Sequence, residues 1–181
     1  MRAELKNVIL FSFSCVLLLA SITCNHSNEK LDGQKLKEHL INANRIMVEN
    51  EQEKIAEFIS RHNWKMDSTG TGLHYMIYEN GSGKTSSTND SVALTGKIFL
   101  LDATLWREYK KENPMQFLIG NKNVPRGFEE AALLMKEGDK GRFIIPAHLA
   151  YGLLGNNDKI PGGTALYAEL ELRSTKSFSK K

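Results

Sequence analysis

Two kinds of hydrophobic periodicity divide the chain. In the first, apolar residues recur three or four positions apart at Leu36, Leu40, Ala43 and Met47, and Ile55, Phe58 and Ile59 resume this helical pattern. This spacing predicts one long amphipathic helix or two short ones. The helical segment should end before Gly70 and Gly72, because residues 67–72 have the composition of a turn. We expect its apolar stripe to pack on the rest of the chain, and a homodimer through this helix is the alternative.

After residue 72 the pattern becomes that of strands. Segments 73–78, 91–99, 115–119, 141–145 and 165–172 alternate or are rich in β-prone residues. One helix is predicted among them, from about Gly127 to Lys136, with Phe128 on its apolar face and Gly138 as a stop signal. A mostly antiparallel sheet with one helix packed across it is an α+β fold with a single core.

The N-terminus has the three parts of an export signal. Arg2 and Lys6 precede an apolar run from Val8 to Ala20, which is too short to span a bilayer comfortably. Cys24 then follows Ser21-Ile22-Thr23, where a lipoprotein signal peptidase would cut before a cysteine that becomes acylated. We predict a signal peptide over 1–23 and lipidation at Cys24. An ordinary cleaved signal or an uncleaved anchor is the alternative, because bacterial lipoproteins usually have Leu-Ala-Gly-Cys.

These segments imply a simple organisation of the 181 residues. We expect a tether and helical segment over 24–69, one domain over 70–176 and a short tail over 177–181. A lipid on Cys24 would anchor the protein to a membrane of the cell envelope. Asn25-His26-Ser27-Asn28 is not an acidic run of the kind associated with surface export, so we expect the periplasmic face.

Charge and composition exclude several functions. The net charge of +3 comes from 24 basic and 21 acidic residues spread along the chain, so nucleic acid is not an expected partner. Gly83-Lys84-Thr85 ends like a phosphate-binding loop, but Tyr78 stands where that loop needs glycine, and a hairpin or loop is predicted instead. The five histidines are scattered, which predicts no metal site. We expect no cofactor.

Six ordered motifs between residues 94 and 161 carry a resemblance. They are Leu94-Thr95-Gly96, Phe117-Leu118-Ile119-Gly120, Val124 to Ala131, Met135 to Lys140, Ile145 to Gly152 and Ile160-Pro161. In order and spacing the chain resembles the FKBP-type peptidyl-prolyl cis-trans isomerases over about residues 70–175. Its lipoprotein-like start and Trp64-Lys65-Met66 look most similar to the gliding-motility-associated isomerase lipoproteins of the Bacteroidetes type.

The resemblance implies an FKBP-like half-barrel, a curved antiparallel sheet wrapped around one short helix, with an apolar pocket that holds a proline ring. Phe128 would form the pocket floor, and Tyr151 would point its hydroxyl at the bound peptide. With Tyr167 they are the implied catalytic residues. The implied substrate-binding residues are Leu94, Trp106, Arg107, Met115, Phe117, Val124, Pro125 and Ile160. Core packing alone could also explain Phe117, Phe128 and Tyr167.

The chain departs from the family at this pocket. Leu94 stands where many members have tyrosine, Arg107 where they have aspartate and Trp106 where they have phenylalanine. Pro125 lies where many members donate a backbone N–H to the ligand, which proline lacks. We therefore expect weak macrolide binding. The resemblance implies isomerisation of X-Pro bonds in exported proteins, and the alternative is a catalytically weak or inactive chaperone or binding module in an envelope assembly.

Overall fold

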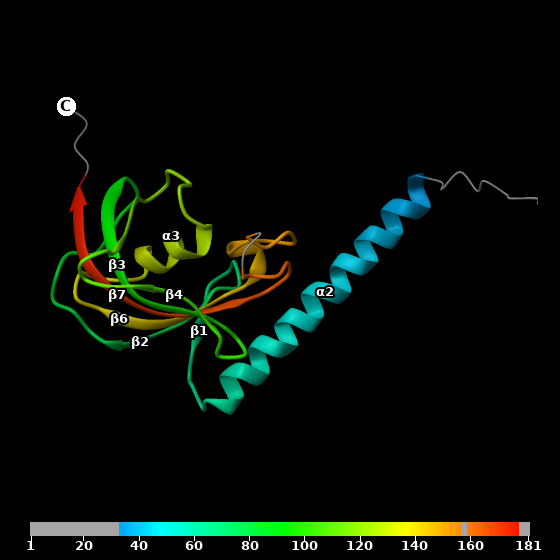
Figure 1. Ribbon diagram of the computed structural model, residues 1–181, viewed down its shortest axis with the longest axis horizontal. Helices are drawn as coiled ribbons and strands as arrows, with labels where there is room; N and C mark the ends of the chain where they lie inside the picture. Colours follow the sequence, from blue (N-terminus) through cyan, green and yellow to red (C-terminus); the bar gives the residue numbers. More distant parts are fainter. Residues whose placement is uncertain (1–32, 157–158, 178–181) are drawn as a thin grey trace, which may run out of the picture. The chain divides into compact units, whose positions relative to one another are not determined.

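The computed structural model describes residues 33–156 and 159–177 (Figure 1). The predicted signal peptide, Cys24, the tether as far as residue 32 and residues 178–181 of the tail lie outside the described residues. Contacts separate the chain up to Leu40 from a compact unit, Ile41–Lys181, to which the packing described below belongs. The predicted N-terminal helical segment is one helix, α2 (Gly33–Arg61).

The domain is an antiparallel sheet closed on a short helix. In sequence order its strands are β1 (Asp67–Ser68), β2 (His74–Glu79), β3 (Asp90–Leu100), β4 (Leu105–Tyr109), β5 (Met115–Leu118), β6 (Lys140–Ile145) and β7 (Leu166–Ser177). Their spatial order is β1-β2-β6-β7-β3-β4, with β5 paired to β3. Helix α3 (Arg126–Leu133) lies in the hollow of the curved sheet (Figure 1). The α+β half-barrel is thus confirmed.

Three local predictions change. Helix α3 ends at Leu133 and not at Lys136. The Leu134 N–H is shared between the carbonyls of Glu130 at 3.3 Å and Ala131 at 3.1 Å, and the Met135 N–H bonds three residues back, to Ala132 at 3.1 Å. Strand β4 was not predicted, because its sequence Leu-Trp-Arg-Glu-Tyr lacks a buried face of alternating apolar residues. Asp67–Ser68 pair with β2 as strand β1, so the turn is confined to residues 69–72.

Side chains of the central strands alternate between two apolar clusters. Leu166 and Ala168 of β7 belong to the main core, together with Phe128 of α3, whereas Tyr167 between them belongs to a second cluster. Ile55 and Phe58 of α2 are 3% and 4% exposed in this second cluster. This part of α2 therefore packs on the chain's own sheet, as expected, whereas Leu36, Leu40 and Met47 of the same stripe are exposed.

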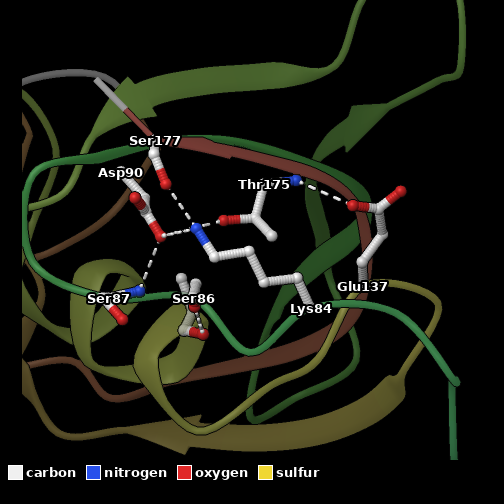
Figure 2. A network of polar contacts seen from close by, with 8 residues as sticks. Lys84, Ser86, Ser87, Asp90, Glu137, Thr175 and Ser177 are labelled. Carbon is white, nitrogen blue, oxygen red and sulfur yellow. Dashed lines mark hydrogen bonds and ion pairs between the residues drawn. The ribbon is translucent and has the colours of Figure 1, made fainter. Parts of the chain in front are cut away.

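The Gly81-to-Thr85 segment is a loop, as expected, and Figure 2 shows what holds it. Lys84 Nζ lies 3.3 Å from Asp90 Oδ2, and the Ser87 N–H donates to the same oxygen at 3.0 Å. Burial of Asp90 opposes its ionisation, but these partners hold the pKa of its carboxyl below the ordinary value. A Cβ on Gly81 would lie 2.3 Å from the Glu137 carbonyl oxygen, so the loop needs glycine here. The glycine at position 81 and the lysine at position 84 therefore have structural roles in this loop.

Candidate functional site

Several partly buried residues pack against the main core, and Trp106, Val124 and Tyr151 are among them. We call these three residues, together with Phe128 of the core, the Tyr151 site. The other predicted substrate-binding residues in the same cluster are buried there: Leu94, Met115, Phe117 and Ile160. The structure thus brings together eight residues that lie between positions 94 and 160 of the sequence.

Trp106 and Tyr151 form the aromatic edge of the Tyr151 site. Their ring centroids lie 5.4 Å apart at an interplanar angle of 72°, an edge-to-face contact. The Arg107 guanidinium carbon lies 4.7 Å from the centroid of the Trp106 ring, a cation–π geometry. Arg107 also donates to the Tyr109 hydroxyl at 3.4 Å. The edge therefore combines two aromatic rings with one cation.

Tyr151 keeps its proton over the physiological pH range. Burial raises the pKa of its hydroxyl, and Tyr109 acts in the same direction, while the nearby Arg107 opposes them. A neutral phenol retains an O–H that can donate a hydrogen bond. Tyr151 can therefore act as a donor to a bound peptide without a change of its charge.

The loop that follows β6 carries both Tyr151 and Ile160. It begins with a short 3₁₀ turn (Ala147–Leu149), and the Gly152 N–H donates to the Ala147 carbonyl at 2.7 Å. Asn156 Oδ1 accepts from the Ile160 N–H at 2.9 Å. A backbone hydrogen bond next to Tyr151 and a side-chain hydrogen bond at Ile160 thus help to hold these two residues in place.

Helix α3 places Phe128 in the core. A Cβ on Gly127 would lie 2.2 Å from Ile145 Cγ2, so glycine allows the helix to approach β6 closely. Pro125 is the N-cap of this helix, and its carbonyl accepts from the Phe128 N–H at 3.0 Å. Pro125 is partly buried beside Val124 and has no N–H to offer a ligand.

Leu94 and Arg107, the two residues that replace polar family residues, have different positions. Leu94 is fully buried, paired with Met115 across β3 and β5, and so belongs to the core beneath the site. Arg107 is exposed on β4 beside Trp106. Besides the Tyr151 hydroxyl, the polar groups at the edge are therefore those of Arg107 and Tyr109.

The expectation that Tyr167 lines the same site is wrong. Tyr167 lies in the second cluster, with ring centroids 5.4 Å from Phe58 and 5.2 Å from Trp64. Its hydroxyl donates to Glu169 Oε1 at 2.5 Å, and it borders a separate 460 Å³ cavity with Phe99. A shift of one residue along a strand moves a side chain to the opposite face.

Two residues of the site region were missed in the sequence. Leu166, the neighbour of Tyr167, faces the main core, and the alternation of Leu166, Ala168, Leu170 and Leu172 with polar residues could have shown this. Tyr109 packs against the same core from β4. No signal pointed to Tyr109, because the strand that positions it was itself not predicted.

Neither a metal centre nor a membrane span is found in the described part of the chain. No group of three or more His, Cys, Asp or Glu side chains in residues 33–156 and 159–177 is arranged to hold a metal ion. Within the same ranges, none of the helices has the length and apolar character to cross a bilayer.

The fold and the clustered residues define a small α+β half-barrel with an aromatic surface site. A sequence profile described as "FKBP-type peptidyl-prolyl cis-trans isomerase" matches residues 83–173, half of the chain. The chain therefore belongs to the FKBP-type peptidyl-prolyl cis-trans isomerase family.

Individual relatives agree with this assignment. The chain is 28% identical over 164 residues to the probable isomerase FkpA of Neisseria meningitidis. This match covers 78% of this chain and 59% of that protein. It is 30% identical over 127 residues to the isomerase Mip of Coxiella burnetii, covering 68% and 54%. The chain thus spans a little over half the length of these relatives.

The solved structures show the same fold. The crystal structure of FkpA from Escherichia coli superimposes with a TM-score of 0.60 at 23% sequence identity. The match covers 98% of this chain and 83% of the FkpA chain. The likeness therefore includes the helical extension as well as the domain.

Proposed function

We propose that this protein catalyses the cis-trans isomerisation of X-Pro peptide bonds. The observation that carries the proposal is the Trp106–Tyr151 pair at the surface of a core that contains Phe128, in a fold of the FKBP family. Such an edge offers an apolar surface for a proline ring and a hydroxyl for the neighbouring peptide group.

The chemistry of the reaction fits this arrangement. The barrier of about 18–20 kcal/mol comes from the amide resonance that keeps the X-Pro bond planar. The planar amide is more charge-separated than the twisted one, so an apolar environment disfavours the ground state relative to the transition state. A donor such as the protonated Tyr151 hydroxyl can hold a substrate carbonyl while the bond twists. The reaction needs no nucleophile.

The substrates in this proposal are proline-containing segments of exported proteins, and the protein assists their folding in the cell envelope. The export-type start and Cys24 support this location, with a lipid anchor on a membrane and the domain facing the periplasm. The likeness to gliding-associated isomerase lipoproteins points the same way. Intact-mass analysis of the mature protein tests the anchor, because an unmodified N-terminus contradicts it.

Pro125 supports a second candidate function. Without an N–H at this position the site loses one hydrogen bond to a ligand carbonyl, worth about 0.5–1.5 kcal/mol. A protein that binds prolyl segments with little turnover would act as a chaperone or binding module. Catalysis and binding therefore have to be measured separately.

The test follows the isomerisation of short X-Pro peptides by residues 25–181, with Tyr167→Phe as the matched tyrosine control for Tyr151→Phe. The uncatalysed reaction takes tens to hundreds of seconds at 25 °C, so modest catalysis is visible. We expect acceleration by the wild type and the control, and a lower rate for Tyr151→Phe. If the folded wild type binds the peptides without acceleration, the binding module replaces the enzyme.

A further inference from the structure

Helix α2 touches the loop that carries Tyr151 and Ile160. Glu51 of α2 accepts a hydrogen bond on Oε1 from the Ala147 N–H at 2.7 Å, across 96 positions of sequence. Ala147 is 5% exposed and opens the 3₁₀ turn that precedes Tyr151. A carboxylate is thus the partner of a buried N–H at the start of this loop.

One helical turn earlier, Met47 contacts the end of the same loop. A Cβ built on Gly163 would lie 3.4 Å from Met47 Cε, so this methyl group packs closely against the glycine. The Gly163 N–H in turn donates to the Gly152 carbonyl at 2.9 Å, which joins the two sides of the loop. Residues four apart on a helix share a face, so Met47 and Glu51 meet both ends of the loop together.

The start of the loop is also held on its other side. His148 Nε2 donates to the Thr71 carbonyl at 2.9 Å, and the Thr71 hydroxyl donates to Glu130 of α3 at 2.6 Å. Ala147 and His148 therefore lie between α2 and the 69–72 turn. Of the two hydrogen bonds that hold Ala147 and His148, only the one to Glu51 comes from helix α2.

We infer that Glu51 is a positioning residue for isomerisation, which acts by fixing residues 147–156 and 159–163 of the loop so that Tyr151 stays in contact with Trp106. The inference rests on the proposed function. Removal of the carboxylate leaves the buried Ala147 N–H without its acceptor, and the loop must shift or admit water to satisfy it. Small displacements of substrate-positioning groups can lower a rate by up to about a hundredfold.

The test compares Glu51→Ala with Glu51→Gln and Glu53→Ala in the protein of residues 25–181. Glutamine keeps an oxygen that can accept from the Ala147 N–H, and Glu53 is an exposed acid of the same helix. For Glu51→Ala we expect faster amide hydrogen exchange confined to residues 147–156 and 159–163 and a kcat/KM about tenfold lower for an X-Pro peptide. Both control variants should stay within about twofold of the wild type.

The outcomes separate this inference from the proposed function. The inference about Glu51 is overturned if amide hydrogen exchange in the loop of Glu51→Ala is as slow as in the wild type. It is also overturned if exchange in the loop becomes faster but kcat/KM does not change. Faster exchange throughout the sheet shows a merely structural role and also overturns it. The wild-type rate alone decides whether the protein is an isomerase. If that rate is absent, exchange and the nuclear Overhauser contact between the Trp106 and Tyr151 rings still decide whether Glu51 fixes the loop.

Discussion

Each face of the sheet carries a tryptophan–tyrosine pair, but the two pairs have different surroundings. Trp106 and Tyr151 lie where the main core meets the surface, beside the exposed Arg107. Trp64 and Tyr167 pack with Phe58 of α2, and the Tyr167 hydroxyl donates a hydrogen bond to the Glu169 carboxylate. Similar residue types therefore border the proposed peptide site on one face and attach a helix on the other.

The largest expected effect is on stability and comes from Phe128, in the core that Trp106 and Tyr151 border. Phe128 is 1% exposed, so Phe128→Ala should lower the free energy of unfolding by about 3–5 kcal/mol, measured by urea titration. Leu133 is 39% exposed on the same helix, and Leu133→Ala should cost less than about 1 kcal/mol. Equal losses in both variants would contradict the placement of Phe128 in the core.

Replacement of the two tyrosines tests the comparison itself. Tyr151→Ala should lower kcat/KM for an X-Pro peptide by about tenfold to a hundredfold, because the substrate loses an aromatic contact and a donor. Tyr167→Phe should change kcat/KM less than twofold, since it removes only the bond to Glu169. The functional distinction between the faces fails if Tyr167→Phe has the larger effect on a folded protein.

Restoring the backbone N–H that Pro125 lacks should have a smaller effect, and this effect should be a gain in ligand affinity. Pro125→Ala returns an N–H beside the site and should strengthen binding of a prolyl peptide or macrolide by up to about tenfold, measured by calorimetry. Asn123→Ala, an exposed change two residues earlier, serves as the control. Nanomolar macrolide binding by the wild type would refute the importance of this donor.

The smallest expected effect is on the pH dependence of the free energy of unfolding, and it comes from Tyr167 on the second face. Burial, followed by the bond to Glu169, raises the pKa of Tyr167 in the folded protein. Above about pH 10 the unfolded chain loses this proton first, so the free energy of unfolding falls as pH rises. The fall should be shallower in Tyr167→Phe, as measured by urea titrations at several pH values. Parallel curves would contradict the raised pKa.

Most of the fold could be predicted from the sequence, because the apolar period changes from helical to alternating at residues 70–73. The family motifs also placed Phe128, Tyr151 and Ile160 in one cluster, since those motifs fix loops as well as strands. Strand β4 could not be predicted, because it is held by pairing with β3 and not by a buried apolar face.

The errors at the site have equally specific causes. Tyr167 was expected at the site from the family resemblance alone, and an error of one residue along a strand moves a side chain to the other face. The alternation from Leu166 to Leu172 contained the correct register. The bond from Ala147 to Glu51 joins residues 96 positions apart. Nothing local in the sequence marks such a contact, because it depends on where α2 packs.

The most direct test uses the two tryptophans as reporters of the two faces. The chain contains only Trp64 and Trp106, so each indole N–H gives an assignable signal in an NMR spectrum of the labelled protein. During titration with an X-Pro peptide, the Trp106 signal should shift in a saturable manner while the Trp64 signal stays in place. A shift of Trp64 with Trp106 unchanged would place peptide binding on the α2 face and contradict the Tyr151 site.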